Sequence, residues 1–425
     1  MSEYMQGGAL ASDDLDFSAS SDRGRASEHA STAVKSPALN VAIGVSAVVM
    51  VVGLVLWFMQ LSGGMVQTGM RNLDSWGFYI TLFMFFVGRS AGGLIISSIP
   101  NAFGMKGFGD ISRVAIWTSI CCTCVAIGFV VVDLGGPLRL WELFVYSNLS
   151  SPLMWDIIVL STYLILSIVY LWAYRREDAG KMSHTAIRVI SIIALVVAVG
   201  VHTVTAWIFS LSAAHEFWHT ALMGPWFVAS ALDCGTALVL IVVIALQKAG
   251  RLTIERSSMV NLAKMLAVFT CVDLYFFACD LLTSGFPGGE GANVVAMLVT
   301  GPLAPFFWTQ IACMVLACVI LFVPRLRTKG GVVLASALVI AGVFCKRCEI
   351  LVGGFQIPNI EFADVANHMT ITNWESGMSL FGYQGLVYWP TPLEFGVALG
   401  VVALGGFLLL LGLKYLPLHL TEKTA

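Results

Sequence analysis

The sequence predicts an all-α integral membrane protein with ten transmembrane helices. The first observation is composition: 58% of the 425 residues are hydrophobic and only 11% are charged, whereas soluble proteins carry roughly 25% charged residues. The second is that apolar runs of bilayer-spanning length recur along the chain. The third is that Lys and Arg fall almost entirely on one side of the predicted membrane.

Each predicted span holds the ~20 mostly apolar residues that a membrane helix needs. The ten runs are 38–62, 76–100, 110–133, 152–173, 185–212, 223–247, 261–283, 298–324, 331–352 and 393–415. Residues 1–37 precede them and are rich in Ser, Ala and acids (ASDDLDFSASSDRGRASEHAST). This composition predicts a disordered tail rather than a signal peptide, whose apolar core would lie near the start. A second short tail follows at 416–425.

The 23 Lys and Arg residues predict the orientation. One set of connections holds only Arg71 and Arg139, three cations lie inside predicted spans, and all others lie at the opposite ends of the spans or in the tails. By the positive-inside rule the Lys- and Arg-rich side is cytoplasmic. Both termini are therefore predicted to be cytoplasmic, in the inner (cell) membrane of a bacterium or archaeon.

The predicted outer connections are 63–75, 134–151, 213–222, 284–297 and 353–392. The last contains Trp374, Tyr383, Tyr388 and Trp389 but no Lys or Arg. A connection longer than ~15 residues usually has a function. Two interpretations stay open: this segment lies in the membrane interface, or it docks a partner.

Several ionisable residues fall inside predicted spans, where they are costly and often functional. They are Arg89, His202, Asp233, Asp273, Asp280, Lys346, Arg347 and Glu349, with Asp133, Asp156 and Glu394 at outer ends. Asp273 and Asp280 are seven positions apart and share one helix face. The residues are either buried ion pairs that fix helix packing or a route for protons or ions.

His202 lies within a span in VGVHTVTAW. A lone membrane histidine can bind haem, donate a hydrogen bond to a neighbouring helix, or contact a quinone. The other six histidines lie in tails, connections or helix ends, which disfavours a second haem ligand at the same depth. A quinone needs only one or two polar groups among apolar walls, and this favours a quinone contact.

The stretch AHEFWHTAL contains His215 and His219 in the H-E-x-x-H spacing of zinc proteases. In those enzymes one helix presents both imidazoles to the metal and the glutamate acts as base. No third ligand is evident, because Asp233 is deep in a span, so an amphipathic turn with its histidines near headgroups is favoured. The Cys345–Cys348 pair is interpreted as two buried apolar side chains.

Longer motifs resemble a known family. They are WGFYITLFMFFVGRSAGGLIISS, VVDLGGPLRLWELF with SSPLMWD, WHTALMGPWFVASALDCGTALVL, TGPLAPFFW, KRCEILVGG and YWPTPLEFGVALGVVALGGFLLL. Their order and spacing resemble the NrfD-like family, the membrane subunits of polysulfide reductase and related complexes. Ten spans resemble its longer branch, which includes hydrogenase-2-type and alternative-complex-III subunits. The resemblance implies two four-helix bundles, from the spans in 76–212 and in 223–352, flanked by 38–62 and 393–415.

The resemblance also implies a function. The protein would be a quinone-interacting anchor subunit of a respiratory oxidoreductase, not catalytic alone, with menaquinone or ubiquinone as an exchangeable substrate. It would bind no haem, iron–sulfur cluster or metal. Its partners would be an iron–sulfur subunit on the extracytoplasmic face and a molybdenum or other redox catalytic subunit, and not nucleic acid. Proton translocation would accompany electron transfer.

Site residues follow from the same resemblance. The quinone site would be formed by His202, Asp133, Arg139, Trp155 and Asp156. The proton route would use Arg89, Asp233, Asp273, Asp280, Lys346, Arg347 and Glu349. The sequence departs from the family in DLGGPLR, where DLGRPLR is commoner, and in Arg89, where a small or apolar residue is expected.

Two other functions remain possible from the residues alone. The intramembrane acids favour an ion- or proton-translocating transporter without a redox role, although no inverted repeat supports it. The HEFWH stretch favours an intramembrane zinc protease.

Overall fold

The computed structural model describes residues 37–70, 74–103, 109–252, 254–356, 388–416 and 418, and its regular elements are all helical. The ten long helices are α1 (Pro37–Gly63), α2 (Phe78–Phe103), α3 (Gly109–Asp133), α5 (Pro152–Asp178), α6 (His184–Ser210), α7 (Met223–Lys248), α8 (Arg256–Gly285), α10 (Ala304–Phe322), α11 (Lys329–Gln356) and α13 (Pro392–Tyr415). The short ones are η2 (Met65–Gln67), η3 (Pro137–Arg139), α4 (Glu142–Val145) and α9 (Glu290–Val299).

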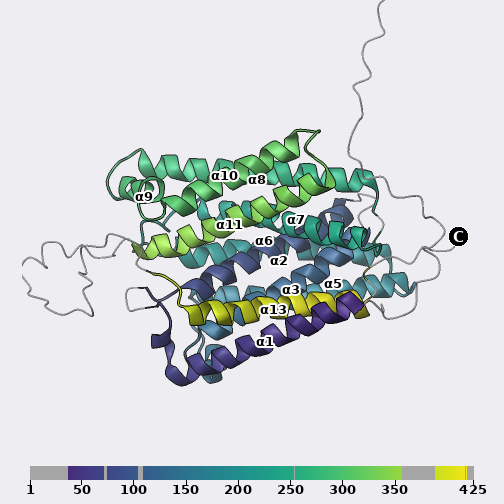
Figure 1. Cartoon of the computed structure of the whole chain (residues 1–425), viewed down its shortest axis with the longest axis horizontal. Coiled ribbons are helices and arrows are strands. Elements are labelled where there is room, and N and C mark those ends of the chain that lie inside the picture. Colours follow the sequence, from purple (N-terminus) through teal and green to yellow (C-terminus); the bar gives the residue numbers. More distant parts are fainter. Residues whose placement is uncertain are drawn as a thin grey trace, which may run out of the picture.

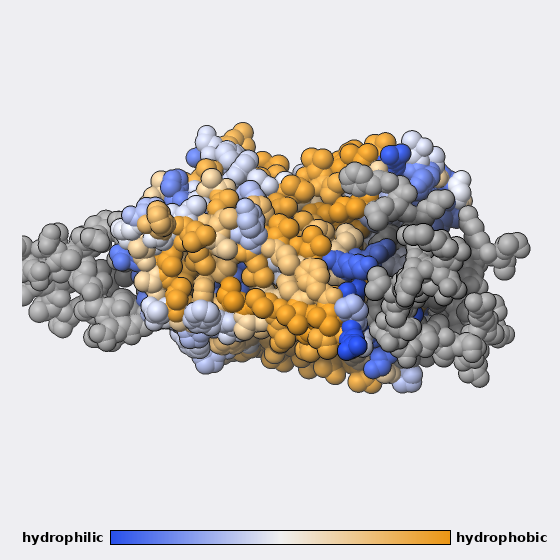
Figure 2. Space-filling view, turned by 90° about the horizontal axis from the view of Figure 1, so that it is seen from above, coloured by the Kyte–Doolittle hydropathy of each residue, from blue (hydrophilic) through white to orange (hydrophobic). Residues whose placement is uncertain are grey.

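The prediction of ten membrane helices is confirmed. Ten helices in the described part are long and apolar enough to cross a bilayer, and they lie side by side along one direction (Figure 1). Hydrophobic residues cover the middle of the face shown in Figure 2, while the most hydrophilic residues gather toward its ends. The protein is therefore a multi-pass membrane protein.

The ten helices form two bundles and an outer pair. Helices α2, α3, α5 and α6 pack together, and so do α7, α8, α10 and α11. Contacts of α7 with α2 and α6 join the two bundles, while α1 packs chiefly against α13 at the edge of the first bundle (Figure 1). This arrangement confirms the two four-helix bundles with their flanking helices.

Glycines allow two of these helix pairs to approach closely. A Cβ atom on Gly92 of α2 would lie 2.7 Å from the Cα atom of Gly235 of α7. Gly53 of α1 and Gly400 of α13 oppose each other in the same way. Small residues are common at membrane helix contacts because they bring two backbones together. The bundle junction is thus held by a glycine contact and by the apolar core around it.

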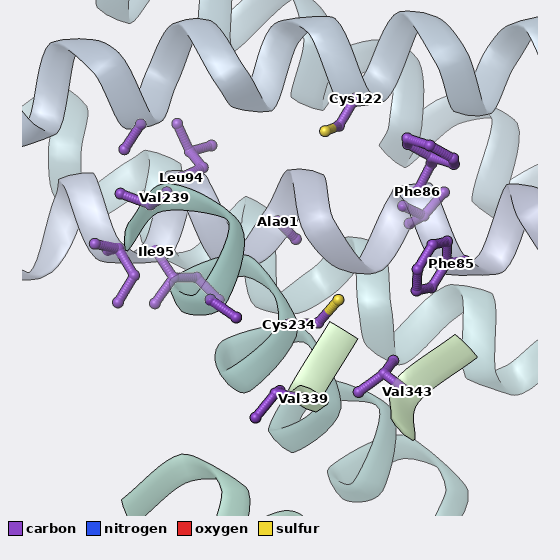
Figure 3. Close-up of a cluster of buried hydrophobic side chains, with 14 of the residues drawn as sticks. Phe85, Phe86, Ala91, Leu94, Ile95, Cys122, Cys234, Val239, Val339 and Val343 are labelled. Atoms are coloured by element: carbon purple, nitrogen blue, oxygen red, sulfur yellow. The ribbon is translucent and has the colours of Figure 1, made fainter. Parts of the chain in front are cut away.

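Figure 3 shows that core, where side chains of α2, α3, α7 and α11 meet. The thiols of Cys122 and Cys234 are part of it, on α3 and α7, and both residues are buried. Cys345 and Cys348 of α11 are buried as well. All four behave as small apolar side chains in this packing.

Several predicted boundaries need correction. Helix α9 begins within the predicted connection 284–297 and ends at Val299, and the span predicted to begin at 298 begins at Ala304. Pro302 and Pro305 lie at that break, where proline disfavours a continuous helix. Helix α11 continues to Gln356, into the connection predicted at 353–392. Residues 1–36 and 357–387, with Trp374 and Tyr383, lie outside the described residues.

Candidate functional site

A buried group of charges joins the helices of the second bundle. The Lys346 ammonium forms an ion pair with the Asp273 carboxylate, and both side chains are almost fully buried. Asp233 lies beside Asp273, and neither of its carboxylate oxygens has a hydrogen-bond partner among the described residues. The buried Arg347 guanidinium also lies near Asp273 and Asp233, so two carboxylates face two cations in a dry interior where an uncompensated charge is costly.

The group lies well inside the apolar helices of the second bundle. We call the end where α6 ends (Ser210) and α13 begins (Pro392) the predicted outer end. Lys346 is ten residues from the outer end of α11, which at 1.5 Å per residue is about 15 Å. This depth is about half the ~30 Å hydrocarbon thickness of a bilayer.

Further acids connect this group with the predicted outer end. Glu349 lies one turn from Lys346 on α11 and is buried. The Gln310 amide nitrogen donates to both Glu349 oxygens at 3.2 Å in its favoured orientation. Glu349, Asp280 and Glu216 then line one cavity of about 20 Å³. That volume is enough for about one water molecule.

The acids and Lys346 therefore form a row that runs from the interior of the second bundle to its predicted outer end. We call it the acid row, and its members are Asp233, Asp273, Lys346, Glu349, Asp280 and Glu216. Arg347 lies beside it. Its guanidinium donates to the Ser230 hydroxyl at 2.5 Å and covers the Phe227 ring at 3.9 Å. Arg89 is separate, and its guanidinium lies 4.0 Å from the centre of the Phe85 ring.

The five residues predicted for a quinone site are not all brought together. Asp156 accepts a hydrogen bond of 2.5 Å from Thr205, which lies one turn beyond His202 on the buried face of α6. Neither ring nitrogen of His202 has a hydrogen-bond partner among the described residues. Asp156 of α5 thus contacts α6 one turn from His202. Trp155 is close by and contacts Trp207 edge to face, with 6.3 Å between ring centres.

The other two predicted residues lie elsewhere. Arg139 is 76% exposed at its side chain and binds Glu142 through two hydrogen bonds of 2.8 and 2.9 Å, a contact that raises its pKa. Asp133 ends α3 and faces Glu394 of α13. Arg139 and Asp133 thus have partners outside the group of Trp155, Asp156 and His202, and their part in a quinone site stays a prediction.

Asp133 belongs instead to a polar cluster at the predicted outer end. The Tyr79 hydroxyl donates to the Gln60 side chain at 2.6 Å, and Gln60 donates to the Val132 carbonyl at 3.1 Å. The fully buried Glu394 accepts hydrogen bonds from the Tyr388 hydroxyl at 2.5 Å and from the Gly69 and Thr391 backbone at 2.8 Å. This network ties α1 and α13 to the first bundle.

Two members of this cluster outside the spans have shifted acidities. Burial, and then the nearby Glu394, raise the pKa of Asp74 to about 7. Burial and the bond to Glu394 also raise the pKa of Tyr388 above its ordinary value. The cluster was missed in the sequence apart from Asp133 and Glu394. The sequence pattern that could have indicated the cluster is T-x-x-E at Thr391, the pattern of a helix capping box. The structure contains this capping box, formed by Thr391 and Glu394.

An open groove lies between α6, α7 and α8. Its volume is about 880 Å³ and its walls are apolar, with Trp207, Leu232, Phe269 and Val272 among them. It extends along α6 from Val199 to Leu211, which corresponds to about 18 Å. Ser210, His219 and Thr220 form its outer end.

Comparison with known proteins assigns the protein to a family. The family model described as "Polysulphide reductase, NrfD" matches residues 66–359. The chain belongs to the NrfD family. This match covers both bundles and confirms the resemblance found in the sequence motifs.

Individual NrfD-like relatives match over most of their length. One is a putative dimethyl sulfoxide reductase membrane subunit of Halobacterium salinarum, 31% identical over 89% of this chain and 91% of the relative. A second is a Hdr-like menaquinol oxidoreductase integral membrane subunit of Archaeoglobus fulgidus, 25% identical over 82% and 86%. A third is a polysulfide reductase chain of Wolinella succinogenes, 26% identical over 67% and 95%.

In this NrfD-family protein the HEFWH stretch is a turn, not a helix. His215 donates from Nδ1 to the Gly354 carbonyl at 2.8 Å, and His219 bonds the Ser210 carbonyl at 3.0 Å. Between them Trp218 is buried and donates to the Ile350 carbonyl at 2.6 Å. Burial lowers the pKa of His215. The two imidazoles therefore lack the shared helix face on which the zinc-protease pattern depends.

Proposed function

We propose that this protein is the quinone-reactive anchor subunit of a respiratory oxidoreductase. Its family match across residues 66–359 carries the proposal, since one relative is named as a menaquinol oxidoreductase subunit and others by the reductases to which they belong. Electrons would pass between the membrane quinone pool and an iron–sulfur subunit on the extracytoplasmic face. That subunit would in turn bind a molybdenum or other catalytic subunit. Both termini would be cytoplasmic.

The acid row would carry protons. Oxidation of one quinol releases two electrons and two protons, and the protons need polar groups to leave a dry interior. Asp233, Asp273, Lys346 and Glu349 lead toward the water-sized cavity beside Asp280. Arg347 would set the electrostatic potential around the acid row. Arg89 would act on the same potential from the neighbouring helix α2. Asp156 and His202 are the predicted residues best placed to receive a proton in the first bundle.

The acid row also favours a second candidate, a proton-translocating membrane protein with no redox role. The two functions differ in whether the protein binds a quinone. A fluorescent quinol mimic such as a hydroxyquinoline N-oxide, titrated with the purified protein in detergent, distinguishes them. Saturable quenching that menadione reverses is expected.

Absence of saturable quenching in folded protein would overturn the quinone proposal. Proton flux in vesicles would then test the second candidate. His202→Ala tests the predicted contact separately. Weaker quenching would place His202 at the quinone, and unchanged quenching would remove His202 from the site without removing the function.

A further inference from the structure

The groove between α6, α7 and α8 has the form of a ligand site on the lipid-facing side of the protein. Trp207 and Val272 on its walls are each 40% exposed, so the groove is open along the membrane-facing surface. The described residues that line it include no Lys, Arg, Asp or Glu. Ser210, His219 and Thr220 lie at the outer end, and Leu232 and Phe269 close the deeper part. Thr203 lines the groove between them, and its hydroxyl donates to the Val199 carbonyl. An occupant should therefore have a long apolar tail and a small polar head without charge.

The chemistry of His219 narrows the choice of head group. Its Nδ1 atom is 3.0 Å from the Ser210 carbonyl oxygen. A carbonyl oxygen only accepts hydrogen bonds, so Nδ1 must carry the hydrogen, and the neutral ring then has an acceptor at Nε2. No described residue forms a hydrogen bond with Nε2, and the ring lines the groove. The head group should therefore be a hydrogen-bond donor, such as a hydroxyl.

We propose that this groove docks a membrane quinol, with its ring hydroxyl donating to His219 Nε2 and its isoprenoid tail lying along α6 and α8. The inference rests on the proposed function and adds a location separate from His202. A phospholipid fits less well, because its phosphate would need a cation or another strong donor, and the described lining offers none. An oxidised quinone has only carbonyl acceptors and would lose the bond to His219.

Thr220 gives the groove a connection to the acid row. It lines the groove, and its side chain is a neighbour of the Asp280 carboxylate. Asp280 in turn lines the water-sized cavity with Glu349. A docked quinol head would thus lie next to the outer end of the acid row.

Two substitutions on α8 form the matched test. Val272→Trp fills the groove from its wall, whereas Val268→Trp places the same ring one turn away on an exposed position that does not line the groove. The hydroxyquinoline N-oxide serves as probe and menadiol as competitor. Val272→Trp should weaken the binding of both molecules at least roughly 10-fold. Val268→Trp should leave both unchanged. Equal binding by the two variants would overturn the groove proposal.

His219→Phe tests the head-group contact. Loss of one neutral hydrogen bond should weaken menadiol binding roughly 3- to 10-fold and leave menadione binding unchanged. Equal loss for both redox forms would contradict a donor-specific contact.

The outcomes also separate this inference from the proposed function. If the wild-type protein does not bind the probe, the proposed function fails first. If it binds and Val272→Trp binds equally well, only the groove fails. Loss of co-purified phospholipid from Val272→Trp with unchanged probe binding would assign the groove to lipid and overturn the proposal.

Discussion

The buried Lys346–Asp273 pair gives the sharpest test of the second bundle. Lys346→Met removes the ammonium and leaves Asp273 beside Asp233 in a fully buried position. Breaking a buried pair by removing one partner costs about 3–5 kcal/mol, because the remaining charge stays uncompensated. Replacing both members by apolar residues is often nearly neutral. Lys346→Met alone should therefore lower the free energy of unfolding by about 3–5 kcal/mol, and Lys346→Met with Asp273→Leu should recover most of the loss.

The free energy of unfolding can be followed by tryptophan fluorescence during SDS titration in mixed micelles. Lys264→Met is the matched control, since Lys264 is an exposed lysine on α8 near the cytoplasmic end predicted for that helix. A double variant as unstable as Lys346→Met alone would refute the reasoning, because it would show that charge compensation is not what Lys346 supplies.

Three further predictions concern other parts of the protein. The pKa of Asp74 is about 7 in the folded protein and 3.8 when the residue is exposed, so the free energy of unfolding should fall as pH rises from about 4 to about 7. Asp74→Asn should remove that part of the pH dependence in thermal unfolding scans. Gly235→Ala should lower the midpoint of thermal unfolding, because the new Cβ atom would lie 2.6 Å from the Gly92 carbonyl carbon. Gly200→Ala on α6 is the control: its Cβ atom would meet nothing within 4 Å, so the midpoint should stay unchanged. Elemental analysis of the purified protein should find no stoichiometric zinc. If the wild-type protein held one equivalent of zinc and His215→Ala held none, the protease interpretation would be supported instead.

The number of spans could be predicted because it depends on a local property, whereas the grouping of the helices came from the family resemblance. Hydropathy over ~20 residues identifies a span, and charged residues within spans must find partners. The cost of burial predicted that these charges pair within the membrane, and the structure supplies the partners, Lys346 and Asp273. The break before α10 was missed because hydropathy continues through Gly301 and Pro302, and the helix there depends on backbone hydrogen bonds that proline removes.

The side-chain clusters were harder to predict because they depend on lateral helix packing. Glu394 binds the backbone of Gly69, which is 325 positions away in the sequence, and no spacing rule connects the two. Asp133 and Asp156 both lie at outer helix ends, yet they have different partners. Asp133 faces Glu394 of α13, whereas Asp156 accepts a hydrogen bond from Thr205 of α6. The HEFWH stretch has helical spacing, but the contacts of Trp218 with α11 hold it as a turn.

The two bundles approach each other at Gly88 of α2. A Cβ atom there would lie 3.9 Å from the His202 ring and 4.0 Å from the Arg347 guanidinium. The absence of a side chain at this position thus lets a first-bundle histidine face a second-bundle cation that lies beside the acid row. A proton on His202 would be repelled by Arg347, so a change in charge at either residue would be felt by the other. This contact offers a direct physical means by which a reaction in the first bundle would influence the proposed proton route in the second.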